Sequence, residues 1–208
     1  MANTNSPFGF KQYFGGAGGA PTMAMVERRI AASNTTPIFT GDPVMPVTGP
    51  ANGYIAQAAA GTSVISGIFN GCKYYSVSAK KTVWSSYWPG SDASGDVYAY
   101  IIDDPNAQFE VMSSWTSPLA TSLTTLGTSP VGQYCQFNIG TGNTATGQSG
   151  AYVDTLGTTI TYPFIVTDLV LAPPGANGAD PTTRYYNVVV GFNNEWRRTN
   201  GAGPTGIA

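Results

Sequence analysis

Three acidic residues fall within eight positions of the stretch VYAYIIDDPNAQFEV, residues 97–111: Asp103, Asp104 and Glu110. Paired carboxylates can catalyse glycoside hydrolysis, and groups of carboxylate oxygens can bind calcium. Here Pro105 fixes φ directly after Asp104, whose carboxylate can accept backbone N–H bonds and start a turn. The stretch contains no cation that would hold the acids together. We therefore interpret them as a turn and its polar flank.

The rest of the chain is poor in catalytic residue types. It contains no histidine, which removes the commonest general base and the commonest metal ligand. Its two cysteines, Cys72 and Cys135, are too few for a zinc site, and we interpret them as small buried hydrophobic residues rather than a disulfide. The sequence thus predicts a protein that is not an enzyme, with no catalytic residue, no cofactor and no metal ligand.

Composition points to many short strands and tight turns. Charged residues make up 10% of the 208 residues, against about 25% in an average domain, while glycine and proline number 26 and 15. The net charge of −2 provides no basic surface for nucleic acid. No apolar run approaches the length of a membrane span, and the first residues lack the apolar core of a signal peptide. We expect neither nucleic acid nor a membrane among the partners.

Alternating apolar residues between turn signals predict one all-β domain over residues 22–196, with an extended N-terminal arm at 1–21 and an irregular C-terminal tail at 197–208. Segment 22–33 fits a helix or a strand, and we favour a strand. Segment 185–192, YYNVVVGF, is apolar on both faces and predicts a central, buried strand.

The clearest local signal is Asn70-Gly71, a pair typical of two-residue hairpin turns, between the expected strands Val64–Phe69 and Cys72–Val77. Gly41-Asp42-Pro43 separates two further short strands. A loop is expected at 85–95, and other strands are expected at 96–102, 107–112, 132–139, 151–155, 159–171 and 184–192.

Aromatic and basic residues are the candidates for a partner interface, where Trp, Tyr and Arg are enriched. Aromatic residues in the arm could anchor it to a partner or pack against the protein's own domain. Isolated basic pairs fit solvated strand ends or docking points for an acidic partner. Tryptophans in expected loops could stack on sugars or on a protein. The candidates are Phe8, Phe10, Tyr13, Phe14, Arg28, Arg29, Trp88, Arg197 and Arg198.

Six segments, taken in order, resemble the head decoration or cement proteins of tailed bacteriophages: NSPFGF, PIFTGDPV, IAQAAAGTSVISGIFNGCKYY, YIIDDPNAQFEV, GNTATGQSGAYVD and VVVGFNN. The resemblance implies a single jelly-roll-like sandwich or β-barrel on the outer surface of the virion capsid. It implies a dimer or trimer that clamps neighbouring subunits of the major capsid protein. The alternative is a carbohydrate-binding or adhesion module of a phage or bacterial surface structure.

Overall fold

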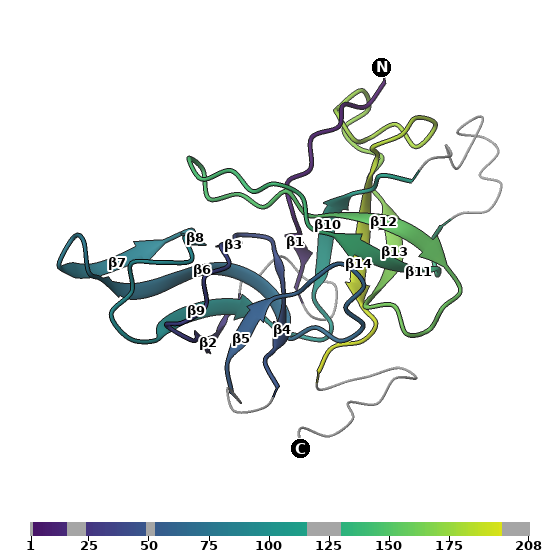
Figure 1. Cartoon of the computed structure of the whole chain (residues 1–208). Helices are drawn as coiled ribbons and strands as arrows, with labels where there is room; N and C mark the ends of the chain where they lie inside the picture. The colour runs from purple at the N-terminus through teal and green to yellow at the C-terminus, as the bar shows by residue number, and fades with distance from the viewer. Residues whose placement is uncertain (1, 16–23, 49–52, 116–129, 197–208) are drawn as a thin grey trace.

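The computed structural model describes residues 2–15, 24–48, 53–115 and 130–196. Within these ranges every regular element is a β-strand, and the strands form antiparallel sheets (Figure 1). The prediction of an all-β protein is therefore confirmed. Strand β2, Val26–Ile30, lies in the segment that fits either a helix or a strand.

The first sheet, sheet A, has six strands in the order β1-β10-β14-β13-β11-β12. Strand β14, Asn187–Phe192, lies between β10 and β13 and is buried along its whole length. This confirms the central position predicted for YYNVVVGF, since a strand covered on both faces has no polar side. The other strands are β1 (Lys11–Phe14), β10 (Gln108–Met112), β11 (Tyr134–Asn138), β12 (Tyr152–Gly157) and β13 (Phe164–Leu169).

The second sheet, sheet B, has the order β2-β9-β6-β4-β5, and β7 pairs with β6 beside this path. A two-stranded ribbon of β3 and β8 completes the regular structure of the described ranges. Strands β1 and β8 lie where the sequence predicts an arm and a loop. The bounds are β3 (Ile38–Phe39), β4 (Pro43–Pro46), β5 (Ile55–Gln57), β6 (Gly67–Ser76), β7 (Lys81–Ser85), β8 (Tyr87–Trp88) and β9 (Val97–Ile102).

Strand β6 is continuous, so the hairpin predicted at Asn70-Gly71 is wrong. Along β9, the partner of Phe69 is Ile101 and the partner of Cys72 is Ala99, which leaves one extra residue on β6. Gly71, with φ of 121°, takes up this residue in a β-bulge. The local preference for a turn is overridden because pairing with β9 continues on both sides of the glycine.

Two clusters of buried side chains fill the molecule. The larger cluster lies on sheet A and includes Ile68 and Ile102 from sheet B, so the two sheets share a core. The smaller cluster fills the inner face of sheet B and is covered by Ile38 and Trp88 from the β3–β8 ribbon. The strands described by the structure form no closed barrel.

The N-terminal segment runs between the two sheets (Figure 1). The Gly9 N–H donates to the carbonyl of Ala151 beside β12, and the Phe10 N–H donates to the carbonyl of Gly41 beside β4. Phe10 is 3% exposed and stacks on Phe164, with ring centroids 4.5 Å apart. Part of the predicted arm therefore packs on the protein's own domain.

Candidate functional site

The acidic stretch forms a turn, as its sequence predicts. Asp104 Oδ1 accepts a hydrogen bond of 2.9 Å from the Asn106 N–H, and the Asp104 carbonyl accepts one of 2.9 Å from the Ala107 N–H. Glu110 lies on β10, where its Oε1 accepts a hydrogen bond of 2.8 Å from Asn187 Nδ2. Each of these carboxylates therefore has a structural partner.

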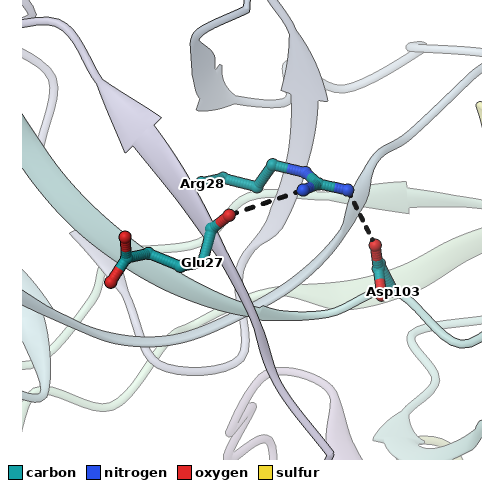
Figure 2. Close-up of polar contacts among 3 residues, drawn as sticks. All are labelled: Glu27, Arg28 and Asp103. Atoms are coloured by element: carbon teal, nitrogen blue, oxygen red, sulfur yellow. Dashed lines mark hydrogen bonds and ion pairs between the residues drawn. The ribbon is translucent and has the colours of Figure 1, made fainter.

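Asp103 has a cation beside it, contrary to the expectation from its neighbours in sequence. Arg28 on β2 donates to Asp103 Oδ2 over 3.1 Å, and the Asp103 side chain is 5% exposed (Figure 2). The Glu27 carboxylate points away from this pair in Figure 2. The residues next to Asp103 in the sequence do not reveal this cation, because Arg28 lies 75 positions away along the chain. Pairing of β2 with β9 places Arg28 opposite Ala99, and Asp103 directly follows β9.

The two cysteine thiols lie in the interior. Cys72 and Cys135 are buried, as predicted, and burial raises the pKa of the Cys72 thiol to about 12 and that of Cys135 as well. Within the described ranges, no group of three or more Cys, Asp or Glu side chains could hold a metal ion. No helix in those ranges is long and apolar enough to cross a membrane.

Two of the predicted interface residues are buried instead of exposed. The expectation that Trp88 is exposed is wrong: it is 0% exposed, because β8 turns it into the core of sheet B, edge-on to Tyr74. Phe10 is buried as well, in the shared core. Arg197 and Arg198 lie outside the described residues.

The remaining candidates are more accessible. Tyr13 and the partly buried Phe14 form an edge-to-face pair with centroids 4.5 Å apart on β1. Strand β1 is an edge strand of sheet A, paired with β10 alone among the described strands. Phe8 is half-buried, while Arg29 is exposed with its guanidinium over the Tyr98 ring.

The outer face of sheet B carries a row of alternating aromatic and cationic side chains. Trp84, Lys73, Tyr98 and Arg29 are directly opposite one another on β7, β6, β9 and β2. The Lys73 ammonium lies 5.2 Å from the Trp84 ring centroid and 5.1 Å from that of Tyr98. These distances are within cation–π range, so the rings hold the cations along the sheet.

Tyr100 extends this aromatic surface beside the bulge. Trp84 and Tyr100 stack with ring centroids 5.9 Å apart and an angle of 4° between their planes. Gly71 lies on β6, the strand between β7 and β9. The expectation of tryptophans in loops misses Trp84, which lies on β7, and its partners. The alternation of Tyr98 and Tyr100 with Val97, Ala99 and Ile101 is the signal that they share an outward face.

Comparisons of the chain with protein-family models, with curated proteins and with solved structures found no match.

Proposed function

We propose that this protein is a structural decoration (cement) protein that binds the outside of an icosahedral phage head and clamps neighbouring major capsid protein subunits. The proposal rests on how the resembling segments are arranged in the fold. Segments that resemble the decoration family in sequence order also contact one another at the seam between the two sheets.

Three of these segments meet through main-chain and side-chain hydrogen bonds. NSPFGF is bonded to PIFTGDPV from Phe10 to Gly41, and to GNTATGQSGAYVD from Gly9 to Ala151. PIFTGDPV and GNTATGQSGAYVD are joined by the hydrogen bond from Ser149 to Asp42. The three segments that carry the resemblance are therefore joined to one another in the fold. This supports an architecture shared with the decoration family better than matches at unconnected places would.

Three further contacts link the remaining segments. The Ile65 N–H donates to the carbonyl of Asn194, which joins IAQAAAGTSVISGIFNGCKYY to VVVGFNN. In YIIDDPNAQFEV, Ile101 pairs with Phe69 and Glu110 pairs with Val189. Because both sheets contribute to the shared core, the proposal includes a jelly-roll-like sandwich as the architecture of the decorating body.

The clamping mechanism follows from how weak contacts combine. A subunit that touches two capsid neighbours through interfaces of about 800 Å² per partner contributes modestly at each one. A dimer or trimer at a symmetry axis links several such contacts, and avidity then rises by about 10²–10⁴ without a new kind of contact. The edge strand β1 provides the aromatic pair of Tyr13 and Phe14 for one of these contacts.

Cryo-electron microscopy of the phage particles that contain this protein tests the proposal. We expect density of its size on the outer head surface, in contact with a second copy and with at least two capsid subunits. Binding of the tagged protein to emptied heads should weaken when Tyr13 and Phe14 are both replaced by Ser. Replacement of the exposed Ile160 by Ser serves as the matched control. Absence of the protein from the head surface would overturn the proposal.

A further inference from the structure

A hollow of about 590 Å³ lies on sheet B where β7 leaves β6. We call it the Trp84 hollow, and its lining consists of Met25, Asn70, Gly71, Cys72, Trp84, Ser85, Ser86 and Tyr100. Its volume falls in the range of about 300–1,000 Å³ that is usual for small-molecule sites. Those sites combine aromatic walls with a few polar groups, which is the composition found here.

The aromatic wall has a ring open to solvent. Trp84 is 68% exposed and is held parallel to Tyr100 by their stacking contact. Gly71 also lines the hollow, and a Cβ added there would lie 3.0 Å from the Ser85 carbonyl oxygen, so a side chain at this position would press on the end of β7. The negative face of an aromatic ring attracts the C–H bonds on the flat side of a pyranose, so this wall fits a sugar ring.

The charge and polarity of the lining narrow the ligand class. The lining contains no Lys, Arg, Asp or Glu. The nearest cation of the aromatic row, Lys73, is placed over the rings of Trp84 and Tyr98. Asn70 supplies a side-chain amide and Ser86 a hydroxyl, both suited to sugar hydroxyl groups. A neutral sugar therefore matches the hollow better than an anionic one.

A second hollow adjoins the first. It has a volume of about 320 Å³, and Asn70 and Ser86 line both hollows. Polar side chains of Gln12, Thr40 and Gln148 also line the second hollow, together with Lys11 and with apolar side chains such as Phe8. A ligand that occupies the Trp84 hollow can therefore continue past Asn70 and Ser86, as a chain of sugars would.

From these observations we infer that the protein binds neutral oligosaccharides, with one pyranose ring stacked on Trp84 and the next units extending over Asn70 and Ser86. This binding activity is separate from attachment to a capsid, which we assign to other surfaces. A head protein with such a site would hold particles near glycan-coated surfaces.

An array of neutral oligosaccharides composed of glucose, galactose, mannose or N-acetylglucosamine tests the inference, followed by calorimetric titration with each hexasaccharide that binds. We expect Trp84→Ala to weaken binding by at least about tenfold, or ~1.4 kcal/mol. Asn70→Ala should weaken it as well. Tyr75→Ala, an exposed aromatic on the same face but outside the hollow, should change affinity by less than about twofold.

Melting temperatures of the variants establish that each one is folded, and sedimentation establishes its oligomeric state. Absence of binding to every neutral glycan, or equal binding by wild type and Trp84→Ala, would overturn the inference. So would conversion of an oligomer to a monomer by Trp84→Ala, because a second copy would then occupy the hollow. Decoration of heads by Trp84→Ala should be unchanged, so the two proposals can fail separately.

Discussion

Ser149 donates a hydrogen bond of 2.5 Å to Asp42 Oδ1, and both residues are buried although 107 positions separate them. The other Asp42 oxygen accepts from the Phe39 N–H at 2.8 Å and from Gln57 Nε2 at 2.7 Å. Ser149 lies in the loop before β12 of sheet A, while Asp42 lies directly before β4 of sheet B. One buried carboxylate thus fastens the two sheets together.

We predict that Ser149→Ala lowers the free energy of unfolding by about 1–3 kcal/mol, because it leaves a buried carboxylate oxygen with one donor fewer. Asp42→Asn should have a similar or larger effect, since an amide has only one acceptor oxygen. Urea unfolding of both variants and of the double variant measures their coupling, which should be about 0.5–3 kcal/mol. Thr144→Ala, exposed in the same loop, is the control. Full additivity of the two substitutions would contradict the link.

Phe10→Ala should destabilise the protein by about 3–5 kcal/mol, because it empties a buried site between Phe164 and Phe137. Deletion of residues 2–14 should prevent stable folding. Phe14→Ala, on the edge strand, should cost much less. Thermal unfolding followed by circular dichroism measures all three. An unchanged melting temperature for Phe10→Ala would show that the segment is an appendage rather than part of the core.

Arg28 and Arg29 allow a matched comparison within one strand. The Arg28 side chain is 29% exposed and pairs with the buried Asp103, whereas that of Arg29 is 59% exposed and lies 3.9 Å from Asp96. We predict that Arg28→Gln costs about 1.5–3 kcal/mol, since it removes a charge-assisted hydrogen bond from a buried carboxylate. Arg29→Gln should cost no more than about 1 kcal/mol. Equal losses in chemical denaturation would contradict this assignment.

Asp92 should make stability depend on pH. Hydrogen bonds from Ser76 Oγ and from the backbone and side chain of Ser78 lower the pKa of Asp92 below its ordinary value of 3.8. The folded state therefore favours the carboxylate, and this stabilisation is complete above pH 3.8 and is lost as the pH falls through the lowered pKa.

Asp92→Asn should accordingly lower the melting temperature at pH 7, with the difference from wild type shrinking at pH values below 3.8. Asn is a suitable replacement because it tolerates the positive φ of 78° at this position. Ser78→Ala removes one donor and should give a weaker pH dependence. If the difference in melting temperature between Asp92→Asn and wild type stayed constant from pH 7 to pH 2, the charge of Asp92 would be ruled out as its cause.

The two thiols should be unreactive in the folded protein. Burial raises the pKa of both, so very little thiolate is present at neutral pH. We expect mass spectrometry to find no iodoacetamide adduct on the native protein and two adducts after denaturation without reductant. A single adduct or none in the denatured protein would indicate an oxidised cysteine.

The sequence alone determined the all-β class, the buried strand at 185–192 and the turn at Asp104. Each of these depends on interactions among neighbours in the chain: alternation along one strand, or a carboxylate beside its own backbone. The same local argument failed at Asn70-Gly71, because a turn and a bulge both need a glycine at positive φ. Only the pairing of β6 with β9 decides between them.

Tertiary structure decided which side chains meet. Arg28 reaches Asp103, Ser149 reaches Asp42, and Trp84 reaches Tyr100 only after the sheets have formed, since strand register sets each contact. It also decided exposure: Trp84 and Trp88 are four residues apart, yet one is open to solvent and the other has no exposed surface. Trp88 lies on the short strand β8, which turns inward, and the direction of β8 depends on the distant strand β3 with which it pairs.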